Sequence, residues 1–204
     1  MARMCRKQNG EPCSVPSAHV SPKAESILTK KEIERKFLIM ENDNIHASYP
    51  FLGIFQCVSD LVVKARLDGT RIVQGYLPMG YAKELATAAG LTVVFHPWEA
   101  RLRLKGDKFY FTLKGKGGLT RNEAEKEISG DLFNEYWKLT EGKVDKTRLK
   151  VTHGKLEIEF DVYNDRKLIV AEMEFSSETE ARSAPCIGKD ITEDDRYKNR
   201  NLAK

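Results

Sequence analysis

Five short stretches of the chain carry a charged residue at every second position, and nearly all the charges within one stretch share a sign. They span residues 32–37, 101–105, 111–116, 156–161 and 171–175. An extended strand places alternate side chains on one face, so each stretch would have one charged and one apolar face. A sheet face that simply meets water usually mixes signs, because like charges placed opposite each other are destabilising. The segregation of acids from bases therefore favours a bound polyanion over a solvated sheet face.

The same alternation, with turn residues between the stretches, predicts the strands that position these charges. We expect about eight strands, joined mostly as antiparallel hairpins, with a turn at Asp68-Gly69 between the second and third. Nine stretches are candidates for these strands: residues 32–37, 61–67, 70–76, 91–105 with an interruption at Pro97, 108–116, 121–128, 143–151, 156–163 and 167–175. For residues 121–128 a helix is the alternative.

Short helices are expected between some of these strands. Residues 82–89 are rich in helix formers and stop at Gly90, and residues 131–141 carry an apolar stripe between Asp131 and Gly142. Residues 177–182 form a helical turn, and the tail over residues 188–203 is irregular. The fold class is α+β, mainly β, with the helices packed outside a sheet whose apolar face they cover. If the sheet closes into a barrel, the charged faces point inward.

The composition of the whole chain excludes several classes of protein. Its 204 residues suffice for one domain that needs no disulfides. A balance of 34 basic and 30 acidic residues is too mild for a general nucleic-acid coat. No apolar run approaches the roughly 18 residues that cross a bilayer. The cysteines form no CxxC pair and the histidines are isolated. We therefore expect a cytoplasmic protein with no nucleic-acid partner, no membrane association and no zinc site.

Residues 1–29 differ in composition from the rest of the chain. They contain Pro12, Pro16 and Pro22 among polar residues and follow neither a helical nor a strand period. We expect a flexible N-terminal extension there, followed by one domain over residues 30–204.

The stretch at residues 32–38, Glu-Ile-Glu-Arg-Lys-Phe-Leu, resembles the ExExK signature of the CYTH domains, the triphosphate tunnel metalloenzymes. Further motifs follow in that family's order. They are Gln74-Gly75-Tyr76-Leu77, Arg101-Leu102-Arg103, Thr112-Leu113-Lys114-Gly115-Lys116, Arg121-x-Glu123-x-Glu125-x-Glu127-Ile128, Lys146-Thr147-Arg148, Glu157-x-Glu159-x-Asp161-Val162, Ala171-Glu172-Met173-Glu174 and Tyr197-x-Asn199-x-x-Leu202-Ala203. The resemblance covers residues 31–203. Residues 40–73 and 78–99 are longer than compact bacterial members lead us to expect, which leaves the choice of substrate open.

The resemblance implies an eight-stranded antiparallel barrel, a tunnel that holds a triphosphate. Arginine suits such a ligand because its planar fork donates two hydrogen bonds to phosphate oxygens, and carboxylates suit Mg²⁺ or Mn²⁺. The expected substrate-binding residues are Lys36, Arg101, Arg103, Lys114, Lys116, Lys146 and Arg148. The expected metal ligands are Glu32, Glu34, Asp161, Glu172 and Glu174. For Glu123, Glu125, Glu157 and Glu159, metal ligation, pairing with bases and a solvent-facing position stay open.

A lysine and tyrosine pair, Lys36 and Tyr76, would be catalytic by the same resemblance. An ammonium held among cations has a lowered pKa and could help to manage a proton of water. The alternative is a phosphate-binding lysine and a packing tyrosine.

The expected reaction is metal-dependent hydrolysis of a small-molecule triphosphate, most simply inorganic tripolyphosphate, by attack of water on a terminal phosphorus. Adenylate cyclisation is the alternative reaction within the family, and a non-catalytic module that binds polyphosphate or nucleotide is the alternative class. We rank both lower, because no residue is recognisable as an adenine reader and because the acids that would hold metal are all present. A homodimer stays open.

Overall fold

The computed structural model describes residues 29–203, so the predicted extension over residues 1–29 lies outside them except for Thr29. The strands are β1 (Lys30–Leu38), β2 (Thr70–Tyr76), β3 (Glu99–Lys105), β4 (Lys108–Lys114), β5 (Thr120–Ile128), β6 (Glu141–His153), β7 (Leu156–Tyr163), β8 (Ile169–Glu174) and β9 (Lys189–Asp190). The helices are α1 (Val58–Asp68), α2 (Met79–Ala89), α3 (Gly130–Trp137), α4 (Glu178–Ser183) and α5 (Asn199–Leu202), with 3-10 turns η1 (Pro50–Ile54) and η2 (Asp195–Tyr197). None of the helices within the described range is long and apolar enough to cross a membrane.

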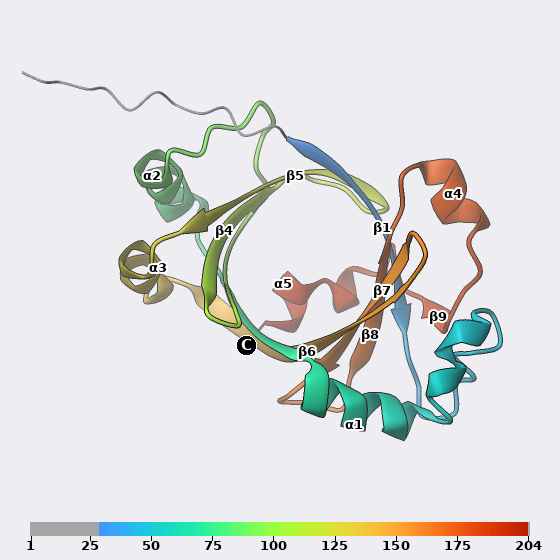
Figure 1. Cartoon of the computed structure of the whole chain (residues 1–204). Coiled ribbons are helices and arrows are strands. Elements are labelled where there is room, and N and C mark those ends of the chain that lie inside the picture. The colour runs from blue at the N-terminus through green and yellow to red at the C-terminus, as the bar shows by residue number, and fades with distance from the viewer. Residues whose placement is uncertain (1–28, 204) are drawn as a thin grey trace, which may run out of the picture.

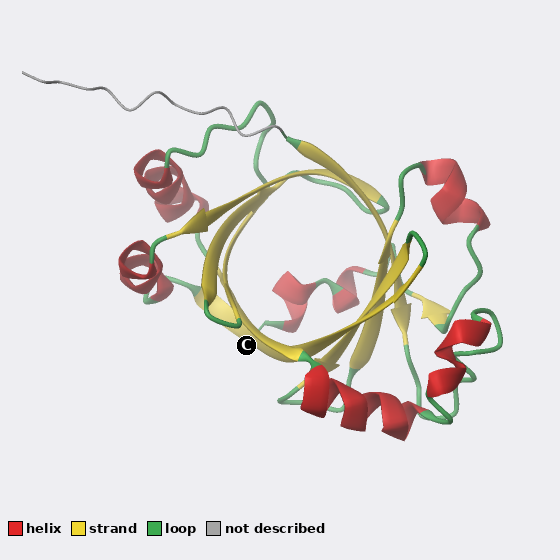
Figure 2. Ribbon diagram, viewed as in Figure 1, coloured by secondary structure: helices red, strands yellow, loops and turns green. Residues whose placement is uncertain are grey.

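Eight antiparallel strands close into a barrel. They pair in the order β5, β4, β3, β2, β6, β7, β8 and β1, and β1 pairs with β5 to complete the circle. Figure 1 looks down this barrel, with α5 visible through its opening, and Figure 2 shows the other helices outside the strands. The tail over residues 188–203, predicted to be irregular, supplies β9, η2 and α5, and β9 pairs with the end of β1. The predicted α+β, mainly β barrel is confirmed.

The outward faces of the strands are apolar, and the helices cover them in two clusters. Leu61 of α1 packs with Phe160 of β7 in one cluster. Leu85 of α2 and Phe133 of α3 pack with Phe111 of β4 in the other. Each of these side chains is at most 4% exposed, and burying one contributes about 1.5–3 kcal/mol. Because side chains alternate along a strand, this outward packing turns the charged faces toward the interior of the barrel.

Residues 61–67 form part of helix α1, so the prediction of a strand there is wrong. A strand would place Leu61, Val63, Ala65 and Leu67 on one face. Leu61 and Ala65 are fully buried, whereas Val63 is 55% and Leu67 76% exposed. The two buried residues are four apart, which is one helical turn, and the helix lays that side against β6 and β7.

Two helix ends also differ from the sequence prediction. Residues 91–95 form no strand. The N–H of Leu91 donates to the carbonyl of Ala86 at 2.8 Å, so it ends helix α2 and does not pair with a neighbouring strand. In α3 the cap is Ser129 rather than Asp131, since its side chain accepts from the Leu132 N–H. Residues 121–128 form a strand, as the first of the two alternatives predicted.

Candidate active site

The inward faces of the barrel enclose a polar cavity of about 360 Å³. Nine basic residues line it: Lys30, Lys36, Arg101, Arg103, Lys105, Lys114, Arg121, Lys146 and Arg148. Seven acidic residues line it: Glu32, Glu34, Glu123, Glu125, Glu159, Glu172 and Glu174. The structure therefore gathers every predicted substrate-binding base except Lys116, and every predicted metal ligand except Asp161, around one space.

Bases and acids of the cavity pair between different strands. Arg103 of β3 donates to both carboxylate oxygens of Glu125 of β5, at 2.7 and 2.6 Å, and Arg101 lies 3.4 Å from the same carboxylate. Lys114 of β4 forms an ion pair with Glu123 of β5. Signs thus segregate along a strand but meet across strands, so the argument that the crowding requires a bound polyanion is wrong for the unliganded protein.

Donors nevertheless remain available within this network. The Nε groups of Arg101 and Arg103 are buried and have no hydrogen-bond partner. Burial, together with the charges of Arg101 and Arg148, lowers the pKa of Arg103 despite its pairing with Glu125. An anion that accepts hydrogen bonds from these arginines would give the buried Nε donors a partner. It would also stabilise the positive charge of Arg103, which burial and the neighbouring arginines disfavour.

Arg148 of β6 is the centre of a second network, on the opposite wall. Its guanidinium donates to Asp161 at 2.7 and 2.6 Å, to Glu172 at 2.5 Å, and also to Glu159. Asp161 is fully buried and also accepts from Lys146. Burial would raise the pKa of Glu172, but the nearby cations hold it well below its usual range. Asp161 therefore lies beneath the bases and holds them in place, and its role as a metal ligand stays a prediction.

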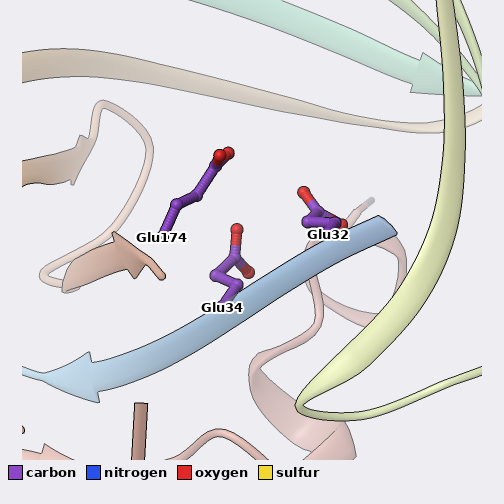
Figure 3. Close-up of side chains that lie close together, drawn as sticks. All are labelled: Glu32, Glu34 and Glu174. Carbon is purple, nitrogen blue, oxygen red and sulfur yellow. The ribbon is translucent and has the colours of Figure 1, made fainter. Parts of the chain in front are cut away.

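Three of the predicted metal ligands form a separate cluster. Glu32 and Glu34 project from β1 and Glu174 faces them from the end of β8, as Figure 3 shows, with one carboxylate oxygen of each within 4.8 Å of the others. Burial, helped by the charges of Glu172 and Glu32, raises the pKa of Glu34. Carboxylate oxygens at this separation are the donors that Mg²⁺ and Mn²⁺ prefer, and a cation among them would relieve their repulsion. The donor set fits a divalent metal ion.

The pKa predicted for Lys36 is wrong in direction. Its ammonium lies 3.0 Å from Glu34 and 2.6 Å from Glu172. Burial would lower its pKa, but these two carboxylates raise it above the usual lysine value. Burial likewise raises the pKa of Tyr76, whose hydroxyl accepts from Gln74 at 2.6 Å. In the unliganded site the protonated forms of both members of the predicted catalytic pair are therefore favoured.

Lys116 and Glu157, for which a site role was predicted or left open, lie away from the cavity. Lys116 is exposed, with its ammonium 5.5 Å from the centre of the Trp98 ring. Glu157 is 44% exposed at its side chain and pairs with Lys150. Each of these residues continues the pattern of a charge at every second position, but at a point of the chain that no longer faces the cavity.

Arg121 is the main cavity residue that the predicted set of site residues omits. Its Nε donates to Glu32 at 2.6 Å, and Lys114 donates to the same carboxylate at 3.1 Å. Burial would raise the pKa of Glu32, but these two bases lower it. The sequence contains a pattern that identifies Arg121 as a residue of the cavity face, because Arg121 begins the series of alternate charged positions that continues with Glu123 and Glu125.

Comparison with known proteins places the chain in a family. No model of a known protein family matches it. An inorganic triphosphatase of Nitrosomonas europaea is 35% identical over 180 residues, covering 84% of this chain and 96% of that protein. An inorganic triphosphatase of Acetivibrio thermocellus is 32% identical over 139 residues, covering 65% of this chain and 89% of that protein. A crystal structure of an inorganic triphosphatase is 30% identical, covers 84% of this chain and 97% of that chain, and superposes with a TM-score of 0.46. The extent of the sequence identity shows that this chain belongs to the CYTH, or triphosphate tunnel metalloenzyme, family.

Proposed function

We propose that this hydrolase cleaves inorganic tripolyphosphate with the help of Mg²⁺ or Mn²⁺, so that water and the triphosphate give phosphate and pyrophosphate. The observation that carries the proposal is the position of three clustered carboxylates, those of Glu32, Glu34 and Glu174, in the same cavity as the nine bases. The two relatives named above are inorganic triphosphatases. A closed, charged cavity suits a compact inorganic anion, which has no apolar part to bury.

The charge balance of the cavity supports a metal ion. Nine bases and seven acids line the cavity, and the buried Asp161, which pairs with Lys146 and Arg148, brings the acids to eight, so one positive charge is in excess when all are ionised. A triphosphate carries about four negative charges near neutral pH. The protein alone therefore neutralises only part of the ligand's charge, and one divalent ion would supply most of the rest. The carboxylate cluster is the place in the cavity with the donors to hold it.

The bases would bind and orient the phosphates. Arg101 and Arg103 already carry unsatisfied Nε donors, and arginine matches phosphate oxygens through two hydrogen bonds at once. Arg148 and Lys146 are fixed by Asp161, so they need little reordering on binding. A metal ion bound by the carboxylate cluster would offset the charge that develops on the phosphate oxygens during attack of water.

Lys36 lies at the junction of the two regions. It contacts Glu34 of the metal-binding cluster and Glu172 of the Arg148 network. Because its two carboxylates keep it protonated, we assign it the role of a fixed positive charge that binds a phosphate oxygen rather than that of a base.

The test is phosphate release from tripolyphosphate by the purified chain with Mg²⁺ or Mn²⁺. We expect Lys36→Ala and Glu34→Gln each to abolish release. Glu157→Gln is the matched control, because this glutamate lies outside the cavity and pairs with Lys150 near the surface. Near-normal release by either cavity variant would overturn the assignment. Parallel incubations with ATP and thiamine triphosphate distinguish the alternatives, since cyclic AMP and pyrophosphate would indicate a cyclase and tight binding without turnover would indicate a binding module.

A further inference from the structure

A second polar cavity of about 540 Å³ lies beside the first. It is formed by the start of β3, the loop after β4, the start of β5 and the segment that carries η2 and α5. Its lining residues include four cations, Lys116, Arg121, Lys198 and Arg200, and two acids, Glu99 and Asp195.

The two cavities adjoin each other, with one shared lining residue and others that are neighbours in sequence. Arg121 lines both cavities, and its Nε donates to Glu32 within the barrel. Asn199 lines the barrel cavity, while its neighbours Lys198 and Arg200 line the second one. A chain-like ligand that passes Arg121 would leave the barrel and enter the second cavity. We call the second cavity the mouth site.

The mouth site holds positive charge that the protein itself leaves unneutralised. Within residues 29–203, neither Lys116 nor Arg200 forms an ion pair with a carboxylate. The guanidinium of Arg200 donates one hydrogen bond, to the carbonyl of Trp98 at 3.0 Å, and keeps its other donors. Lys198 pairs with Asp195 at 2.6 Å, but this local pair is largely solvent-exposed and contributes little. An anionic ligand would find two unpaired cations and a third held by a weak pair.

We propose that the mouth site binds the additional phosphate groups of linear inorganic polyphosphates longer than tripolyphosphate, with the terminal three phosphates inside the barrel. This inference rests on the proposed function of the barrel cavity, since the end of the chain must lie there. A linear polyphosphate carries the same repeating charge along its whole length, so a row of cations that continues past Arg121 can follow it.

A nucleoside is the competing occupant, because the ring of Trp98 is 57% exposed and aromatic faces stack on bases. The ammonium of Lys116 lies over that ring, 5.5 Å from its centre. A base would have to displace this cation, whereas a phosphate group would gain it as a partner. The cations therefore favour the inorganic anion.

The test compares equilibrium binding of tripolyphosphate with that of linear polyphosphates of four and five phosphates, by titration calorimetry without metal. We expect the wild type to bind the longer chains more tightly. Arg200→Gln and Lys116→Gln should each reduce that preference, expressed as a ratio of dissociation constants, by roughly three- to tenfold. Lys155→Gln, which removes an exposed charge from the turn between β6 and β7, is the control and should leave the ratio unchanged.

The outcomes separate the two proposals. Using both variants guards against a structural effect of Arg200, because the side chain of Lys116 makes no hydrogen bond to any other residue in the range 29–203. An unchanged ratio in both variants, with tripolyphosphate still hydrolysed, overturns the mouth site alone. If the ratio of dissociation constants is unchanged and Trp98→Leu binds ATP more weakly than the wild type does, the mouth site binds a nucleoside instead. A wild type that neither binds nor hydrolyses tripolyphosphate contradicts the proposed function, and the mouth site with it.

Discussion

Replacing Arg103 by glutamine removes one base from the cavity wall and leaves the backbone of β3 intact. The guanidinium is 14% exposed, spans both oxygens of Glu125 and keeps a buried Nε donor with no partner. Since the pKa of Arg103 is lowered by burial and by neighbouring cations, a bound phosphate would gain a donor that the protein does not fully satisfy. The substitution should therefore affect ligand binding more strongly than its pairing with Glu125 suggests.

The size of the effect follows from the hydrogen bonds lost. One hydrogen bond to a charged group contributes about 1.5–3 kcal/mol, which corresponds to roughly a 10- to 150-fold weaker affinity for tripolyphosphate. The free energy of unfolding should fall by about 1–3 kcal/mol, because Glu125 loses its closest base. Glu125 keeps its hydrogen bond from Thr112 at 2.7 Å and its contact with Arg101, so the fold should persist.

Steady-state hydrolysis of tripolyphosphate and thermal unfolding measure the two effects separately. Arg71→Gln is the matched control, because Arg71 also spans a carboxylate, that of Asp145, at 3.1 and 2.6 Å, but lies 68% exposed outside the barrel. The double variant Arg103→Gln with Glu125→Gln should regain stability without regaining kcat/KM. If Arg103→Gln and Arg71→Gln hydrolyse tripolyphosphate with the same kcat/KM, the assignment of the β3 arginines to phosphate binding is refuted.

Three further substitutions test the rest of the site. In EDTA, Glu34→Gln should raise the Tm at pH 7, because burial raises the pKa of Glu34 in the native protein and its ionised form therefore costs stability. The gain in Tm over the wild type should shrink as the pH falls toward about 4, where a glutamate in the unfolded chain is itself protonated. Asp161→Asn should lower the free energy of unfolding by about 3–5 kcal/mol in chemical denaturation, since Lys146 and Arg148 lose a buried partner. Tyr76→Phe should reduce kcat less than about tenfold, as the raised pKa keeps the phenol from acting as a base; a loss of about a thousandfold in steady-state assays would restore its catalytic role.

The alternation of side chains along strands was enough to predict which face of the sheet carries the charges. It succeeded for β3, β4, β6, β7 and β8 because each has apolar residues on one face that must be buried. It failed for residues 61–67, where four apolar residues at alternate positions suit a strand as well as a helix. Only the burial of Leu61 and Ala65 against the barrel decides between the two.

The pairing of charges could not be predicted from the sequence, because it depends on contacts between strands far apart in the chain. Arg121 meets Glu32 only because β5 pairs with β1 when the barrel closes. Asp161 lies opposite Arg148 in the register of β7 against β6, and a slip by one residue would turn it outward. The alternation indicates which side chains face the cavity, and the register decides which acids and which bases meet there.

Lys36 shows what this distinction means for the chemistry. The sequence prediction counts it among the basic residues of a phosphate-binding set, which suggests an ammonium held among cations. The register of β1 against β8 places it opposite Glu172, and Glu34 lies within 3.0 Å, so its real neighbours are acids. The two carboxylates favour the protonated ammonium of Lys36 in the unliganded site. We therefore expect Lys36 to act on the reaction through its charge, with the proton of the attacking water passing to a phosphate oxygen or to a carboxylate.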